Sequence, residues 1–250
     1  MGGLNVLLPT VFRARMELSL WRTRLSCSTR PEGIARLPLP GWRMNFLARA
    51  IALFICVGLG AAYAEEAKVR VVTYGTSLTA SGKWQAALQT ELQRCWGRDV
   101  AVLNRAAGGK GSNWGLANVE KVAEAQPDFA IVEFAINDAR LKGGSSLDTS
   151  RQQTRAIVDA IKAAQPKAKV FLMITPMVRG ERAKLRPSLA DYHQMYRDLA
   201  SEGVAGLIDN QRAWSDIPDA DIPDGVHPTP AAHRAVTVPG IVHAIAPDCH

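Results

Sequence analysis

Hydrophobic and polar positions follow two alternating patterns along residues 65–250. Short runs rich in Val, Ile, Leu and Phe indicate buried strands, and longer stretches with apolar residues at helical spacing indicate helices. The predicted strands are 69–74, 100–103, 129–134, 170–174 and 204–208. The predicted helices are 83–96, 114–125, 150–164, 188–201 and, closing the chain, 230–245. This alternation predicts an α/β fold, a three-layer α/β/α sandwich around a five-stranded parallel sheet with right-handed crossovers.

The pattern before residue 65 is that of a targeting segment. The segment 44–49, Met-Asn-Phe-Leu-Ala-Arg, is a short, positively charged start, and an apolar run follows over 50–60. Ala-Tyr-Ala at 62–64 is typical of a signal-peptide cleavage site. We therefore predict that 44–64 is a signal peptide and that the protein is periplasmic or secreted.

The mature chain is expected to be a single domain over residues 65–250. The apolar run of the leader is shorter than the roughly 20 residues that a membrane span needs. We expect no stable membrane anchor after cleavage, and an uncleaved anchor is the alternative. Residues 1–43 are rich in Arg and Pro and precede an internal start at Met44, so we interpret them as a non-native or untranslated extension.

The net charge of +7 comes from the leader rather than from the domain. Residues 1–64 hold eight Arg and two acidic residues, which leaves 22 basic and 21 acidic residues in 65–250. A nearly neutral domain gives no indication of a nucleic-acid partner. We expect no nucleic acid among its partners, and we expect a monomer.

Two cysteines, Cys95 and Cys249, remain after the leader is removed. In an exported protein such a pair is typical of one disulfide, which here would join the end of the first long helix to the carboxyl terminus. The alternative is two unrelated thiols.

Polar and glycine-rich segments follow four of the predicted strands. Ser77 comes after the first strand, Gly108-Gly109 after the second, Asn137-Asp138 after the third and the turn 224–227 after the fifth. In an open parallel sheet the ligand crevice lies beyond the carboxyl ends of the strands. The four segments are therefore expected to meet at one edge of the sheet.

Ser77, His227 and Asp224 are the side chains best suited to chemistry. A serine hydroxyl becomes a nucleophile when an imidazole removes its proton and a carboxylate orients that imidazole. The three-residue spacing of Asp224 and His227 can place both side chains on one side of a turn. The alternative for Ser77 is a helix N-cap. The alternative for 224–228, Asp-Gly followed by Pro, is an acidic turn without a catalytic role.

Two further segments can supply hydrogen-bond donors. Asn137 follows the third predicted strand, where it is either a turn residue or an amide donor to an oxyanion. The segment 104–112, Asn-Arg-Ala-Ala-Gly-Gly-Lys-Gly-Ser, fits the spacing of neither common phosphate-binding loop. A glycine N–H aimed at a developing negative charge is the better interpretation.

These motifs together resemble the SGNH hydrolase superfamily, the GDSL-type esterases and lipases. The resemblance covers Gly-Thr-Ser-Leu at 75–78, the glycine of 104–109, the Asn of Ala-Ile-Asn-Asp at 135–138 and Asp-Gly-Val-His at 224–227, in the order of the family. It implies a flavodoxin-like SGNH hydrolase fold. Thr76 replaces the usual Asp, and Ala135 replaces the usual Gly.

The resemblance also implies a role for each residue of the site. Ser77 is the expected nucleophile and, with Gly109 and Asn137, forms the expected oxyanion hole. His227 is the expected general base, and Asp224 is expected to orient it.

The expected activity is hydrolysis of carboxylic esters through a Ser-His-Asp acyl-enzyme. The substrate is expected to be a small-molecule or polysaccharide ester with a short acyl group, such as acetyl on a carbohydrate. No cofactor and no metal are expected, although the acids of 216–224 leave a calcium site as the alternative. Two other functions stay open, an O-acyltransferase and a non-catalytic carbohydrate-binding protein.

The basic residues that follow the fourth predicted strand have a less specific interpretation. They are Arg179, Arg182, Lys184 and Arg186. We expect a solvated loop, with contact to an anionic substrate as the alternative.

Overall fold

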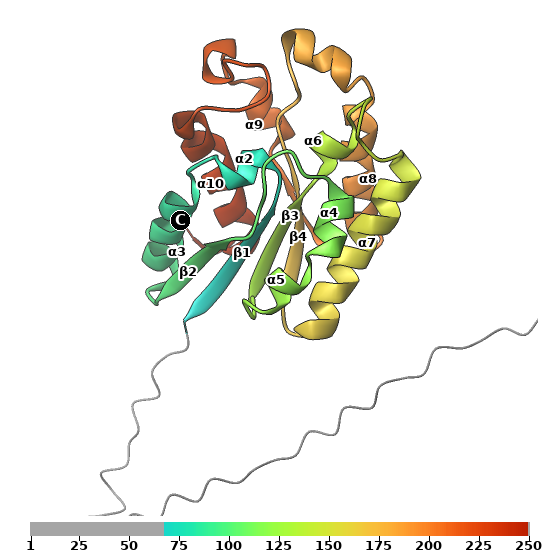
Figure 1. The fold of residues 1–250 in the computed structure, drawn as a ribbon. Coiled ribbons are helices and arrows are strands. Elements are labelled where there is room, and N and C mark those ends of the chain that lie inside the picture. Colours follow the sequence, from blue (N-terminus) through green and yellow to red (C-terminus); the bar gives the residue numbers. More distant parts are fainter. Residues whose placement is uncertain (1–67, 250) are drawn as a thin grey trace, which may run out of the picture. The chain divides into compact units, whose positions relative to one another are not determined.

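A five-stranded parallel sheet forms the centre of the computed structural model, which describes residues 68–249 (Figure 1). The order across the sheet is β2-β1-β3-β4-β5. The strands are β1 (Val69–Gly75), β2 (Val100–Asn104), β3 (Phe129–Glu133), β4 (Lys169–Ile174) and β5 (Gly206–Asp209). The expected extension 1–43 and signal peptide 44–64 lie outside the described residues.

Helices occupy the connections between the strands. The long ones are α3 (Gln85–Trp96), α7 (Leu147–Ala164), α8 (Leu189–Ser201) and α10 (Pro230–Ile245). The short ones are α2 (Ser77–Ala80), α4 (Ser112–Ala117), α5 (Glu120–Ala123), α6 (Ala135–Asp138) and α9 (Gln211–Ser215), with 3-10 turns at η1 (Gly180–Leu185) and η2 (Asp219–Asp221). No helix among the described residues is both long and apolar enough to cross a membrane.

The sheet has one apolar core on each face. On one face Leu88 and Leu92 of α3 and Ile241 of α10 pack against β-strand side chains such as Val71. On the other face α7 and α8 cover a larger core, which includes Ile157. Both faces are buried, which is why the strands read as nearly continuous apolar runs. The predicted three-layer α/β/α sandwich is confirmed.

The strand order places a topological switch point between β1 and β3. The chain leaves β1 toward β2 on one side and later leaves β3 toward β4 on the other, which is the flavodoxin-like arrangement. The segments that follow β1 and β3, which carry Ser77 and Asn137, therefore begin next to each other at the carboxyl edge of the sheet. In the register of these strands Gly75 lies opposite Glu133.

The helix predicted over 114–125 is two short helices instead. Asn118 ends α4, its side-chain amide donates to the carbonyl oxygen of Trp114 at 2.9 Å, and its backbone N–H donates to Gly115. An asparagine side chain that binds the backbone in this way competes with helical hydrogen bonds. The apolar spacing continues across the break, so the sequence pattern alone does not reveal it.

Candidate active site

Ser77, His227 and Asp224 form a connected chain of hydrogen bonds. The Ser77 Oγ lies 2.8 Å from the Nε2 of His227, and the Nδ1 of the same ring lies 2.7 Å from the Oδ2 of Asp224. An ionised carboxylate only accepts hydrogen bonds, so a neutral His227 carries its proton on Nδ1. Its Nε2 is then the acceptor, and the Ser77 hydroxyl donates to it.

Asp224 also receives two backbone hydrogen bonds. The N–H groups of Val226 and His227 donate to its Oδ1 at 2.9 and 2.7 Å. Partial burial raises the pKa of Asp224, but the hydrogen bonds from His227 and Val226 outweigh this effect and lower the pKa to about 2. The carboxylate is therefore ionised at neutral pH.

The turn that carries Asp224 and His227 requires a glycine at its second position. Gly225 has a φ of 75°, in the left-handed region that glycine adopts without strain. A Cβ at this position would lie 2.5 Å from the carbonyl oxygen of Arg179. The N–H of Arg179 in turn donates to the carbonyl oxygen of Gly225 at 2.8 Å, which attaches the turn to the segment after β4.

Ser77 is the first residue of the four-residue helix α2, which is held by contacts outside itself. Its carbonyl groups accept from side chains: the Trp84 indole N–H donates to Leu78 at 3.1 Å, and the Gln85 and Asn104 amides donate to Thr79. A helix of one turn is not stable alone in water. Its position therefore depends on these contacts and on a buried carboxylate, Glu133, which binds Thr76 and Thr79.

Gly109 and Asn137 lie in two segments that a hydrogen bond connects. The Asn137 amide donates to the carbonyl oxygen of Lys110 at 2.9 Å. Gly109 has a φ of 72°, and a Cβ on the preceding Gly108 would lie 3.9 Å from the Ser77 Cβ. The glycine segment therefore passes beside Ser77. The second hydrogen of the Asn137 amide remains available to another acceptor.

Asp138, next to Asn137, binds Ser112, the residue that follows the glycine segment 108–111. Its carboxylate accepts from the Ser112 N–H at 2.8 Å and from the Ser150 hydroxyl at 2.6 Å. Burial raises the pKa of Asp138 above its ordinary value, while the bonds from Ser112 and Ser150 oppose this shift. This structural role of Asp138 cannot be recognised from the sequence, because its partners Ser112 and Ser150 lie in other segments of the chain.

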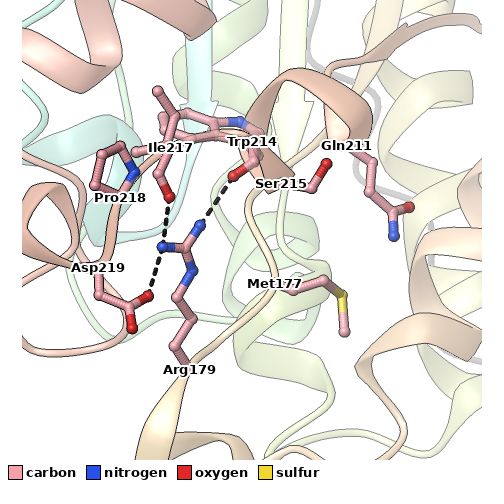
Figure 2. A pocket seen from close by; sticks show the side chains of 8 residues that line it. All are labelled: Met177, Arg179, Gln211, Trp214, Ser215, Ile217, Pro218 and Asp219. Atoms are coloured by element: carbon pink, nitrogen blue, oxygen red, sulfur yellow. Dashed lines mark hydrogen bonds and ion pairs between the residues drawn. The ribbon is translucent and has the colours of Figure 1, made fainter.

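The solvated-loop prediction for the basic residues after β4 is wrong for two of them. Arg186 is only 8% exposed, and its Nε donates to the carbonyl oxygen of Ile136 at 2.7 Å. Arg179 donates to the carbonyl oxygens of Ile217 and Trp214 and pairs with Asp219 at 2.8 Å (Figure 2). Both guanidinium groups hold backbone segments in place, a role that charge pattern alone does not indicate.

Arg179 and Asp219 also line two neighbouring hollows. The first, of about 490 Å³, has a mixed lining that includes Met177, Trp214 and Gln211 (Figure 2). The second, of about 390 Å³, reaches Asp224. Neither Ser77 nor His227 is among the residues that line these two hollows. Within residues 68–249 no three His, Cys, Asp or Glu side chains are grouped as a metal site requires.

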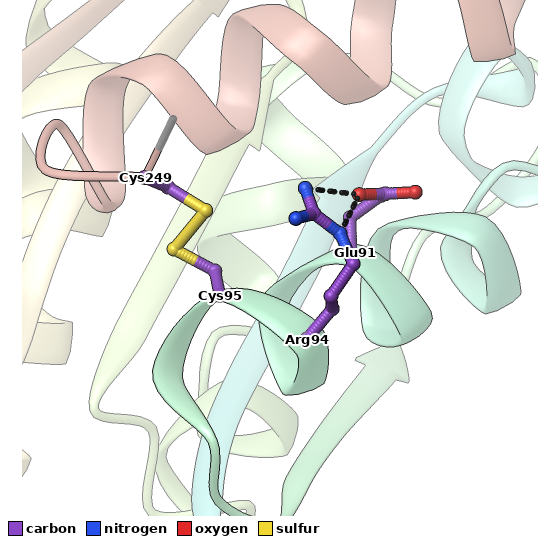
Figure 3. The surroundings of a disulfide bond; sticks show 4 residues. All are labelled: Glu91, Arg94, Cys95 and Cys249. Atoms are coloured by element: carbon purple, nitrogen blue, oxygen red, sulfur yellow. Dashed lines mark hydrogen bonds and ion pairs between the residues drawn. A yellow bond between two sulfur atoms is a disulfide. The ribbon is translucent and has the colours of Figure 1, made fainter.

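A disulfide joins Cys95, in the last turn of α3, to Cys249 after α10 (Figure 3). The two Cα atoms are 5.4 Å apart, and 154 positions separate the residues in sequence. The chain-entropy model assigns a loop of this length roughly 4 to 5 kcal/mol of stabilisation as an upper value. The bond thus ties the end of the chain to the helix that follows the Ser77 segment.

A Ser-His-Asp chain at the carboxyl edge of a parallel sheet is typical of serine hydrolases. Residues 72–235 match the GDSL-like lipase/acylhydrolase family, and the chain belongs to this family. The resemblance to the SGNH hydrolases is therefore confirmed, and the protein is a hydrolase that acts on ester bonds.

Individual relatives agree with this assignment. A GDSL esterase/lipase of Arabidopsis thaliana is 25% identical over 200 residues, which cover 66% of this chain and 81% of the relative. An acetylxylan esterase of Geobacillus stearothermophilus has a similar structure, with a TM-score of 0.62, 21% identity, and coverage of 71% of this chain and 94% of the other. A lipase/acylhydrolase of Enterococcus faecalis gives a TM-score of 0.63 at 22% identity, over 73% and 97% of the two chains. At these identities the two structures show the shared fold.

The low pKa of Asp224 predicts the effect of removing the His227 ring. His227→Ala deletes the bond to Oδ2 but keeps both backbone donors, so we expect the pKa of Asp224 to rise from about 2 toward its ordinary 3.8. Because the folded pKa is the lower one, the ionised carboxylate stabilises the fold above pH 3.8, and this contribution disappears as the pH falls toward 2. An NMR titration of the carboxyl carbon measures both values. An Asp224 pKa of 3.8 or higher in the unsubstituted protein would contradict this description of the turn.

Proposed function

We propose that the protein is an exported serine esterase in which Ser77 is the nucleophile, His227 the general base and Asp224 the carboxylate that orients the base. The observation that carries this proposal is the pair of distances along the chain, 2.8 Å from Ser77 to His227 and 2.7 Å from His227 to Asp224. The first distance lies within the range in which a base removes a proton from a nucleophile, and the second is a hydrogen bond that orients the base.

The reaction begins when the Ser77 oxygen attacks the carbonyl carbon of the ester. The hydroxyl proton moves to Nε2 of His227, and the imidazolium that forms is stabilised by Asp224. The alcohol leaves with that proton, and the acyl group stays on Ser77. Water then attacks the acyl-enzyme, and its proton moves to His227. The bond between the acyl group and Ser77 breaks, the proton passes from His227 to the Ser77 oxygen, and the carboxylic acid is released.

The negative charge on the tetrahedral oxygen needs donors that are already in place. We assign these to the N–H groups of Ser77 and Gly109 and to the side-chain amide of Asn137. The bond from Asn137 to Lys110 supports this assignment, because it fixes the amide beside the glycine segment and uses only one of its two hydrogens.

The open surroundings of the site favour short acyl groups. The side chains of His227 and Asp224 are 46% and 44% exposed. An added methylene contributes about 0.8 kcal/mol to binding only where it leaves water. We therefore propose an acetyl ester as substrate, with a carbohydrate as the alcohol. The charged residues that line the hollow next to Asp224 and the structural likeness to an acetylxylan esterase support this choice.

We also propose that residues 44–64 direct export and are removed, which leaves residues 65–250 as the mature enzyme. The charged start, the apolar run and the Ala-Tyr-Ala segment support this division. The disulfide between Cys95 and Cys249 agrees with an oxidising compartment.

The Ser77 hydroxyl is expected to be indispensable for turnover. Ser77→Ala should lower kcat for an aryl acetate by more than about a thousandfold, since the nucleophile is gone. Asn137→Ala should lower kcat by about a hundredfold or more through the loss of one oxyanion donor. Ser81→Ala is the matched control, because Ser81 is an exposed serine at the other end of α2. A Ser77→Ala enzyme as active as the Ser81→Ala control would refute the mechanism.

The preference for short acyl groups is tested with aryl acetate, butyrate and octanoate esters. We expect kcat/KM to be highest for acetate and to decrease with chain length. Acetylated xylo-oligosaccharides are then supplied together with an unmodified sugar, and the products are separated. Free acetate is expected. Transfer of acetyl to the sugar would instead support an acyltransferase, and a preference for octanoate would rule out the short-acyl proposal.

Export is tested by sequencing the amino terminus of the protein recovered outside the cytoplasm. We expect the mature chain to begin at Glu65. Replacing Ala62 and Ala64 by leucine should leave an uncut precursor, since the peptidase needs small residues there. A protein that retains its leader in the cytoplasm would contradict the proposal.

A further inference from the structure

Glu133 is a buried carboxylate directly beneath the segment that carries Ser77. It ends β3, in the centre of the sheet, and is 1% exposed. Its partner in the register of the parallel strands is Gly75, the last residue of β1. A Cβ at Gly75 would lie 2.3 Å from the Glu133 Oε1 and 2.4 Å from its backbone oxygen. Only glycine at 75 therefore leaves the space through which this carboxylate reaches the next turn.

Three donor groups on two threonines bind the carboxylate. The Thr76 N–H donates to Oε1 at 2.6 Å, and the Thr76 hydroxyl lies 3.0 Å from both Oε1 and Oε2. The Thr79 hydroxyl donates to Oε1 at 2.7 Å. Both threonines are buried. Glu133 therefore holds the residue immediately before Ser77 and the residue two positions after it.

These bonds determine which way the residues between them point. Leu78 is buried in the core, whereas the Ser77 hydroxyl faces His227. The Thr76 hydroxyl also accepts from the Leu78 N–H at 3.3 Å and so caps α2. Thr76, a departure from the usual Asp of this motif, thus provides a hydroxyl that donates to Glu133 and accepts from the helix.

We propose that Glu133 is a positioning residue for the nucleophile. By binding Thr76 and Thr79 it fixes the Ser77 hydroxyl relative to His227 and to the oxyanion donors. This inference rests on the proposed role of Ser77. Glu133 does not touch the substrate. Its contribution is geometric, because a displacement of about 1 Å at a reacting group can cost on the order of a hundredfold in rate.

The donors around Glu133 are all neutral, which suits a structural carboxyl more than an ion pair. Burial raises the pKa of Glu133 to about 7, although the hydrogen bonds from Thr79 and Thr76 act in the opposite direction. The carboxyl oxygens accept from the turn in either protonation state. An amide oxygen can replace one of them, whereas an apolar side chain cannot.

Two substitutions of similar size compare a side chain that can still accept hydrogen bonds from the turn with one that cannot. Glu133→Gln keeps an oxygen that accepts from the Thr76 N–H and the Thr79 hydroxyl, and we expect kcat within about tenfold of the unsubstituted enzyme. Glu133→Met removes every acceptor, and we expect kcat for an aryl acetate to fall about a hundredfold with KM changed by less than about threefold. Thermal unfolding of each variant establishes that it is folded at the assay temperature.

A matched pair of threonine substitutions tests the same idea with less risk to folding. Thr76→Val removes the hydroxyl that binds Glu133. Thr73→Val removes an equally buried hydroxyl of β1 that has no hydrogen-bond partner among residues 68–249. We expect Thr76→Val to lower kcat, and the rate at which a fluorophosphonate labels Ser77, by about tenfold or more. Thr73→Val should leave both unchanged.

The outcomes separate this inference from the proposed function. Equal kcat and labelling rates for the two threonine variants, or a folded Glu133→Met enzyme within about threefold of the normal kcat, would overturn the role of Glu133 alone. An active Ser77→Ala enzyme would overturn the proposed function. A loss of kcat in Thr76→Val and Glu133→Met that Glu133→Gln largely restores would support positioning.

Discussion

The parallel pairing of β1 with β3 is the constraint on which the rest of the site depends. It places Gly75 opposite Glu133, so that a carboxylate from one strand accepts hydrogen bonds from the turn that follows the other. The same pairing forms the switch point of the sheet, so the segments after β1 and β3 begin next to each other at its carboxyl edge. Ser77 and Asn137 are therefore brought to one edge of the sheet by strand register rather than by direct contact.

The other residues of the site, Gly109, Asp224 and His227, come from loops. Separate contacts attach these loops to the rest of the domain. Arg179 binds the turn of Asp224 and His227 through its backbone and the segment 214–219 through its side chain. Asp138 binds the segment that follows Gly109. Buried or backbone-directed polar contacts such as these are expensive to leave unmade. They hold the loops in fixed positions relative to Ser77, although the side chains of His227 and Asp224 are partly exposed to solvent.

The sheet and the main helices could be predicted from sequence because burial on both faces gives an unambiguous apolar pattern. The candidate site residues Ser77, Gly109, Asn137, Asp224 and His227 were chosen because each follows the carboxyl end of a strand or lies in a recognisable motif, and their roles remain proposals. The short helices α2 and α6 have too few residues to show a period.

Glu133 was missed because a single acid at the end of an apolar run looks solvent-exposed. Only the pairing with Gly75, which joins residues 58 positions apart, reveals its burial. Arg186 was misjudged for the same reason, since its partner Ile136 is distant in sequence.

In the proposed mechanism Ser77 carries the acyl group during turnover. Rapid acid quenching of the enzyme during hydrolysis of an aryl acetate, followed by mass spectrometry of its peptides, tests this directly. Slow deacylation can be ensured with an ester whose acyl group hydrolyses poorly from the enzyme. We expect one acyl group on the peptide that contains Ser77 and none in the Ser77→Ala protein. Turnover that proceeds with the acyl group on another residue would contradict it.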